Sequence, residues 1–235
     1  MNNRPLILST KLLSDSEKAL AVALGLEIKA HAFIDTRVDI SAINQSTLVA
    51  LQHEKVTMIF TSQHAVNAVA QLLQGIPKQW DIFCINGKTQ KTLLQYVNRE
   101  QIKGSAISAI HLWEVIARFT KDQKLYYCCG NLSLGTLREK LTALQFDFQE
   151  VEVYRTIETP YVIDENYNLI LFFSPSGVAS FVKENAVKPD LPVVAIGKTT
   201  ERALEKVGFY NIATALEPTL SAMFLIAQQI FQIRK

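Results

Sequence analysis

Short apolar runs alternate along almost the whole chain with segments in which apolar residues recur at helical spacing. The runs are nearly continuous, and each is followed by a polar or glycine turn and then by a helical pattern. They lie at residues 5–10, 26–33, 56–61, 81–86, 125–129, 169–174 and 193–196. Unbroken apolar strands that alternate with helices are typical of parallel sheets covered on both faces. The pattern therefore predicts an α/β protein.

The intervening segments carry signals for helix ends. Apolar residues at helical spacing over residues 12–24 predict a helix, with Ser14 as its N-cap and Gly25 at its end. Similar patterns predict helices over residues 107–119, 134–144 and 219–231, and residues 148–153 read as a further strand.

The chain also repeats itself. Two strands end in hydroxyl residues before a helix, and two others end in a Gly-Lys-Thr turn before a helix. The matching strings are Phe60-Thr61-Ser62 with Phe172-Phe173-Ser174, and Ile85-Asn86-Gly87-Lys88-Thr89 with Ala195-Ile196-Gly197-Lys198-Thr199. Because the separations within the two copies are similar, we expect two α/β units of one design. The alternative is a chance match of short apolar strings.

The two copies are not placed head to tail. The second copy lacks a strand–helix–strand after its glycine turn, and residues 5–33 supply one. We therefore expect a split domain, residues 1–33 with 161–235, and an inserted domain, residues 38–152. Linker strands at 31–37 and 152–160 would join these two doubly wound, flavodoxin-like or Rossmann-like domains as a hinge, with a ligand cleft between them.

The composition of the chain argues against some classes of binding partner. The chain has 235 residues, 49% hydrophobic and 20% charged, and its 24 Lys and Arg nearly balance its 22 Asp and Glu. A balance so near zero gives no basic field, so nucleic acid and membrane are not expected partners. No apolar run approaches the roughly 20 residues of a membrane span, and the start has no signal-peptide pattern. We expect a cytoplasmic monomer.

Five turns at strand ends are candidates for an anion site. Free N–H groups and the helix dipole at such turns attract carboxylate or phosphate. The competing interpretation is that Thr89 and Thr199 only cap their helices. The candidate residues are Thr61, Ser62, Gly87, Thr89, Gly130, Asn131, Ser174, Ser176, Gly177, Gly197, Lys198, Thr199 and Thr200.

Groups for acid–base or metal chemistry are scarce. The 4 His are scattered; His64 opens the helix after Thr61 and Ser62, so it could face the cleft, but exposure to solvent is the favoured interpretation. The 3 Cys form no disulfide framework or metal-ligand spacing; Cys129, beside Gly130, is the one expected to approach the cleft. Tyr154 ends a predicted strand where the chain should cross between domains, so its hydroxyl could serve a ligand or its ring could pack in the hinge.

Six short motifs, each weak alone, occur in an order and at intervals that resemble those of the uroporphyrinogen-III synthase family. The resemblance extends over essentially the whole chain. The motifs are Ile59-Phe60-Thr61-Ser62, Cys129-Gly130-Asn131, Val153-Tyr154-Arg155-Thr156, Phe172-Phe173-Ser174-Pro175-Ser176-Gly177, Ala195-Ile196-Gly197-Lys198-Thr199-Thr200 and Glu217-Pro218-Thr219.

The resemblance implies a cofactor-independent enzyme of tetrapyrrole biosynthesis that needs no metal. Its substrate would be hydroxymethylbilane, a linear tetrapyrrole with eight carboxylates. The family closes the ring with loss of water and inverts the last pyrrole, ring D. It also implies two α/β domains joined by a two-stranded linker, with the active site between them.

The resemblance also implies roles for particular residues. Tyr154 matches the tyrosine that assists departure of the substrate hydroxyl. Arg155 and Lys198 would add positive charge, and the turn at Gly87 and Thr89 is an irregular version of the family's glycine turn. The turns that match those holding carboxylates contain Thr61, Ser62, Ser174, Ser176, Gly177, Gly197, Thr199 and Thr200.

Two other functions remain open from the residues alone. One is a cytoplasmic binding or sensor protein that closes on a small anionic ligand without chemistry. The other is a nucleotide-dependent enzyme, which ranks lower because neither G-x-G-x-x-G nor the Walker spacing occurs.

Overall fold

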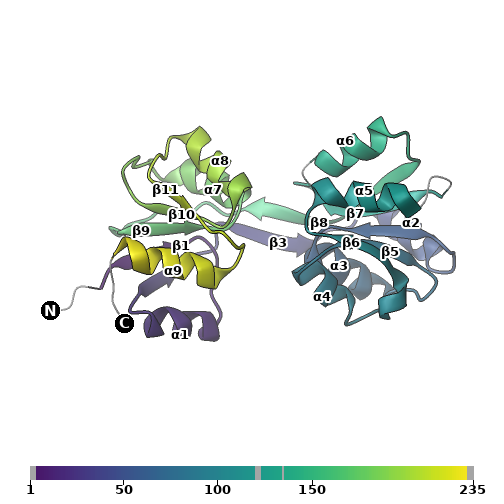
Figure 1. Ribbon diagram of the computed structural model, residues 1–235, viewed down its shortest axis with the longest axis horizontal. Coiled ribbons are helices and arrows are strands. Elements are labelled where there is room, and N and C mark those ends of the chain that lie inside the picture. Colours follow the sequence, from purple (N-terminus) through teal and green to yellow (C-terminus); the bar gives the residue numbers. More distant parts are fainter. Residues whose placement is uncertain (1–3, 120–122, 134, 232–235) are drawn as a thin grey trace. The chain divides into compact units, whose positions relative to one another are not determined.

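The structure, a computed structural model, describes residues 4–119, 123–133 and 135–231. The chain divides into two compact units. Unit 1 is Met1–Asp35 with Ile157–Lys235, and unit 2 is Thr36–Thr156. The chain passes from one unit to the other within strands β3 (Ile34–Val38) and β8 (Phe148–Glu158), which are neighbours in one sheet (Figure 1).

Unit 1 contains a five-stranded sheet in the order β11-β10-β9-β1-β2, in which every neighbouring pair is parallel. Its strands are β1 (Leu6–Ser9), β2 (Glu27–Ala30), β9 (Leu169–Phe172), β10 (Val193–Ala195) and β11 (Ile212–Thr214). Its helices are α1 (Asp15–Ala23), α7 (Pro175–Glu184), α8 (Lys198–Val207) and α9 (Leu220–Ile230).

Unit 2 contains a six-stranded sheet in the order β3-β8-β7-β4-β5-β6. Besides β3 and β8, its strands are β4 (Thr57–Phe60), β5 (Asp81–Ile85), β6 (Ile102–Ala106) and β7 (Leu125–Gly130). Its helices are α2 (Ala42–Leu51), α3 (Gln63–Leu73), α4 (Lys88–Leu93), the 3-10 turn η1 (Arg99–Gln101), α5 (Ala109–Phe119) and α6 (Thr136–Ala143).

Each sheet has a hydrophobic core on both faces because successive side chains of a strand point to opposite sides. In β1, Ile7 packs with residues of α1 and α9, whereas Leu8 packs with residues of α7 and α8. In unit 2, Phe60 faces α2, α3 and α4, while Ile59 faces α5 and α6. Strands β4 and β9 are buried along their whole length. The predicted α/β class with parallel sheets is confirmed.

The two sheets have the same spatial order but different chain order. Reading β11-β10-β9-β1-β2 against β6-β5-β4-β7-β8 pairs β9 with β4 and β10 with β5, as the repeated strings require. The β1–α1–β2 portion of unit 1 then corresponds to β7–α6–β8 of unit 2. In each sheet the helices after the two central strands lie on opposite faces, which makes a topological switch point between β9 and β1, and between β4 and β7.

Helix ends follow local chemistry. Ser14 caps α1, as the sequence predicts, and the structure adds a full capping box with Glu17; the helix begins at Asp15 and not at residue 12. Gly25, with φ 77°, ends it.

The expected start of a helix at residue 134 lies outside the described residues. Strand β8 continues to Glu158, beyond the predicted end at residue 153. Within the described ranges, no helix has the length and hydropathy to cross a membrane.

Candidate functional site

The carboxyl end of β4 places two hydroxyl residues beside the switch point of unit 2. Ser62 is the N-cap of α3, and its Oγ accepts a hydrogen bond from the N–H of His64 at 3.1 Å. Thr61 Oγ1 lies 2.9 Å from Tyr127 Oη. Burial raises the pKa of Tyr127 to about 12, although its hydrogen bond with Thr61 acts in the opposite direction. Tyr127 therefore stays protonated and holds Thr61 in place.

The neighbouring strands β7 and β8 bring Gly130 and Tyr154 together. The register shifts after Cys129, which pairs with Glu152, so that Gly130 stands opposite Tyr154. A Cβ built on Gly130 would lie 2.4 Å from two atoms of the Tyr154 ring. Only glycine leaves room for the ring in this position. Tyr154 is thus a half-buried residue within β8 of unit 2, and not the end of a strand.

His64 is a further member of this edge. Its ring centroid is 5.6 Å from that of Tyr154, with an angle of 43° between the planes. His64 is exposed as a whole residue, as expected from sequence, yet partial burial of the ring and the nearby charge of Lys88 lower its pKa. The signal in the sequence was its position at the start of the helix that Ser62 caps, where His64 is the second residue. Its contact with Tyr154 depends on the fold and was missed.

The Gly87 turn lies at the end of β5. Gly87, with φ 81°, is the N-cap of α4 and offers no side-chain hydrogen bond to the helix. Thr89 is 6% exposed, so its side chain is not presented at the surface. The interpretation of Thr89 as a helix cap is wrong, because the glycine takes that position. Lys88, the first residue of α4, is exposed beside His64.

The side chain of Asn131 forms hydrogen bonds with the backbone of β8. Its Oδ1 accepts from the N–H of Thr156 at 2.8 Å, and its Nδ2 donates to the Thr156 carbonyl at 3.2 Å. Arg155, expected to add positive charge, pairs instead with Asp39 at 3.3 Å and with Glu152 at 3.1 Å. Arg155 is therefore paired with carboxylates, whereas Lys88 is exposed at this edge.

In unit 1, the carboxyl end of β9 repeats the arrangement of β4. Ser174 is the N-cap of α7, and its Oγ accepts from the N–H of Gly177 at 3.0 Å. The hydroxyl of Ser176 lies 3.0 Å from that of Ser174. Gly177 is buried against Ser174 and Thr10, the residue that follows β1 across the switch point. Two serine hydroxyls and the first turn of α7 thus share one edge.

The Gly197 turn follows β10 on the same edge. Gly197 is the N-cap of α8 without a side-chain hydrogen bond, so Thr199 does not cap the helix either. Thr199 is exposed, whereas Thr200 is 1% exposed and its hydroxyl has no hydrogen-bond partner among the described residues. The expectation that Thr200 contacts a ligand at this surface is not supported by its placement. Lys198 forms an exposed ion pair with Glu201 at 2.7 Å.

The cysteines do not contribute a nucleophile. All three are buried. Burial raises the pKa of Cys84 and of Cys129 to about 11, and that of Cys128 further. Cys129 was expected to approach the cleft, but it is only 5% exposed and does not reach the surface. In the part of the chain that the structure describes, no three His, Cys, Asp or Glu side chains are grouped in a way that suits a metal ion.

Each unit therefore presents hydroxyls and helix N-termini at the carboxyl edge of its sheet. Unit 2 adds a phenol, an imidazole and an ammonium group from Tyr154, His64 and Lys88. Main-chain N–H groups at helix N-termini can bind carboxylates. A phenol or an imidazolium can donate a proton to a leaving hydroxyl.

Comparisons with known proteins agree with this arrangement. The family model described as uroporphyrinogen-III synthase HemD matches residues 23–224. The uroporphyrinogen-III synthetase of Helicobacter pylori is 16% identical, with a TM-score of 0.69 over 97% of this chain and 99% of that one. A mutant uroporphyrinogen III synthase of Thermus thermophilus is 14% identical, with a TM-score of 0.67 over 98% and 100%. A search of curated proteins gave no match.

The two solved structures share the fold of this chain, and the family model covers most of its length. This match favours the enzymatic interpretation over a binding or sensor protein. The chain belongs to the uroporphyrinogen-III synthase family, whose members are cyclising lyases of tetrapyrrole biosynthesis.

Proposed function

We propose that this chain converts hydroxymethylbilane to uroporphyrinogen III, with loss of water and inversion of ring D. The observation that carries the proposal is the family match over residues 23–224. The position of Tyr154 over Gly130, beside the switch point of unit 2, supports it further because ligands bind outside the carboxyl ends of strands at such points.

Binding of the substrate is assigned to the carboxyl edges of both sheets. The first turns of α3, α7 and α8 have N–H groups that form no intrahelical hydrogen bond, and these groups suit carboxylates. In unit 2, Ser62 accepts a local hydrogen bond; in unit 1, Ser174 accepts one and lies within hydrogen-bond distance of Ser176, and Thr199 is exposed. Binding by main-chain groups agrees with a net charge of only +2.

The reaction requires one proton donor and control of the conformation of the substrate. Departure of the hydroxyl as water is assisted by the pyrrole nitrogen lone pairs, and the proposed donor of the proton is Tyr154. The resulting azafulvene cation is attacked by the substituted carbon of ring D. The spiro intermediate formed in this way fragments and recloses with ring D inverted. Holding the flexible chain in that geometry can supply up to about 7–11 kcal/mol.

The testing experiment is an isomer assay. Fresh hydroxymethylbilane is added to the purified chain, to the heat-unfolded chain and to buffer, each with a chelator, and the oxidised products are separated by chromatography. The folded chain should give the type III isomer in excess, while the two controls give the type I isomer of the uncatalysed closure. A product mixture equal to the controls would refute the enzymatic proposal.

A further inference from the structure

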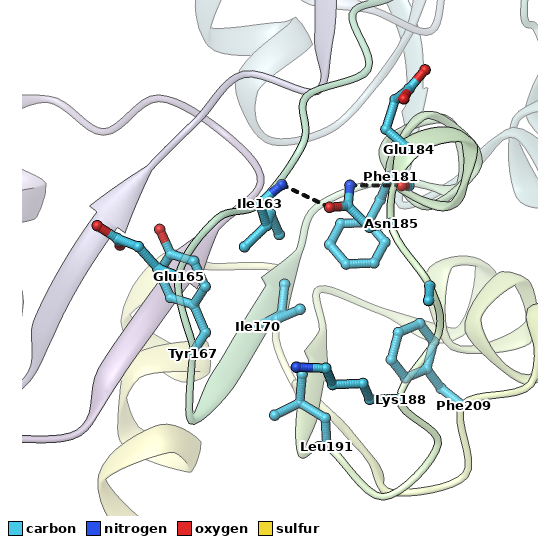
Figure 2. A pocket seen from close by; sticks show the side chains of 11 residues that line it. Ile163, Glu165, Tyr167, Ile170, Phe181, Glu184, Asn185, Lys188, Leu191 and Phe209 are labelled. Atoms are coloured by element: carbon cyan, nitrogen blue, oxygen red, sulfur yellow. Dashed lines mark hydrogen bonds between the residues drawn. The ribbon is translucent and has the colours of Figure 1, made fainter.

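A pocket lies in unit 1 at the edge of the sheet opposite the candidate site. Ile170 is near the start of β9, Leu191 precedes β10, and Phe209 comes between α8 and β11. These residues mark the amino ends of parallel strands, whereas Ser174 and Gly197 follow the carboxyl ends. The pocket contains about 610 Å³ of space, including open solvent (Figure 2). The proposed reaction does not use it.

One wall is the loop before β9, which Asn185 holds in place. Asn185 Oδ1 accepts from the N–H of Ile163 at 2.8 Å, and Nδ2 donates to the carbonyls of Tyr161 at 2.7 Å and Phe181 at 2.9 Å. Ile163, Glu165 and Tyr167 alternate along this segment and line the pocket. One amide side chain therefore fixes the wall to the end of α7, and the pocket exists before any ligand arrives.

The interior of the pocket is apolar. Ile170, Phe181 and Phe209 form its floor and are each at most 3% exposed, so the apolar surface open to a ligand comes mainly from the partly exposed Ile163, Tyr167 and Leu191. Figure 2 shows the rings of Phe181 and Phe209 and the side chain of Ile170 gathered around the space, with Leu191 below them. A surface of this kind suits an aromatic or aliphatic group of a ligand.

The charged groups on the rim are not equivalent. The carboxylate of Glu165 is engaged by Lys29 and by the hydroxyl of Tyr167, and burial and this hydrogen bond raise the pKa of Tyr167. In Figure 2 the carboxylates of Glu165 and Glu184 are directed away from the space, while the ammonium of Lys188 extends toward Ile170 and Leu191. Lys188 forms no ion pair within the described residues.

We propose that this pocket binds a small amphipathic anion, with an aromatic or aliphatic body against Ile163, Tyr167 and Leu191 and a single carboxylate at Lys188. A linear tetrapyrrole with eight carboxylates does not suit so small an apolar interior. The site is therefore separate from that of the proposed substrate, and it stands whether or not the chain has the proposed activity.

The proposal is tested with two probes of the same ring and nearly the same shape, the anion 2-naphthoate and its neutral amide, 2-naphthamide. Each is titrated into the full chain and followed by ligand NMR, and amide shifts of the ¹⁵N-labelled protein locate the site. We expect saturable binding that shifts the amides around Ala186 more than those around Ser174. Naphthoate should bind roughly two- to fivefold more tightly, the range of a solvent-exposed ion pair.

Three variants decide the outcome. Lys188→Gln should remove the preference for naphthoate, whereas Lys206→Gln, an exposed lysine of α8 outside the pocket, should keep it. Ala186→Phe should fill the rim and weaken both probes by about tenfold or more. The proposal is overturned by the absence of saturable binding, by a carboxylate preference that survives Lys188→Gln, or by unchanged binding in a folded Ala186→Phe chain. If Ala186→Phe does not fold, the lysine pair alone decides.

Discussion

Gly130 and Tyr154 stand opposite each other on β7 and β8, and the space that a Cβ of residue 130 would need is filled by the Tyr154 ring. The glycine therefore fixes where the phenol lies. The neighbouring ring of His64 limits the phenol from the side of α3. The register of β7 and β8 and the missing side chain at Gly130 together position the hydroxyl group of Tyr154.

The first prediction concerns the hydroxyl itself. Tyr154→Phe keeps the ring over Gly130, so the free energy of unfolding should change little, while kcat falls by about 100-fold or more through loss of the proton donor. Steady-state kinetics of uroporphyrinogen III formation and urea unfolding would measure the two effects. Tyr96→Phe, at an exposed tyrosine of the same unit, is the control. A Tyr154→Phe chain that retains the wild-type rate would make Tyr154 a packing residue only.

The second prediction concerns the space under the ring. Gly130→Ala should displace Tyr154 and lower the free energy of unfolding by about 1–3 kcal/mol, the usual cost of overpacking. The rate should fall with it, because the phenol moves. Gly135→Ala is a matched control, since its Cβ would meet only the movable carboxylate of Glu139 at 3.1 Å. Equal stability of the two alanine variants would show that the ring moves aside without cost.

The third prediction concerns the protonation of His64. Its pKa in the folded chain is below the ordinary 6.5, so the unfolded chain binds more protons between these two values. The stability that His64 contributes is present above pH 6.5 and is lost as the pH falls through the lowered pKa. His64→Gln should therefore lose less free energy of unfolding than the wild type between pH 7.5 and about pH 5. Parallel urea curves at both pH values would measure this.

The charge on Lys88 offers an independent check of the same relationship. Lys88→Gln removes a positive charge near the imidazole, so the His64 pKa should rise toward 6.5 in an NMR titration. Lys91→Gln, on the same short helix, should have a smaller effect because Lys91 is not among the causes of the shift. An unchanged His64 pKa in Lys88→Gln would leave burial as the only cause.

The limits of sequence reasoning can be seen in particular elements. Strands β4 and β9 were predictable because both of their faces are buried and their residues are almost all apolar. The sequence of β6, Ile-Lys-Gly-Ser-Ala, has no such signal, and no strand was predicted there; its pairing with β5 defines it. Likewise, the capping box at Ser14 is local and was predictable, whereas the contact between His64 and Tyr154 joins residues 90 positions apart.

The fourth prediction separates a structural role of Asn131 from a binding role. Asn131→Ala leaves the N–H and carbonyl of Thr156 without their side-chain partners, so the free energy of unfolding should fall by about 1–3 kcal/mol. Asn131→Asp retains the acceptor for the N–H but loses the donor to the carbonyl, and its loss should be smaller. Denaturant unfolding of both variants is the measurement. A fall in substrate affinity without a fall in stability would assign Asn131 to the ligand.

The fifth prediction reverses an expectation from sequence at the Gly197 turn. Thr200, expected to bind a carboxylate, has a buried hydroxyl without a partner in the described chain, whereas Thr199 is exposed. Removing an unpaired buried hydroxyl at constant shape relieves a desolvation cost. Thr200→Val should therefore leave KM unchanged and raise the free energy of unfolding by up to about 1 kcal/mol, while Thr199→Ala raises KM two- to tenfold through loss of one hydrogen bond of about 0.5–1.5 kcal/mol. A higher KM in Thr200→Val would mean that the first turn of α8 opens to expose this hydroxyl when substrate binds.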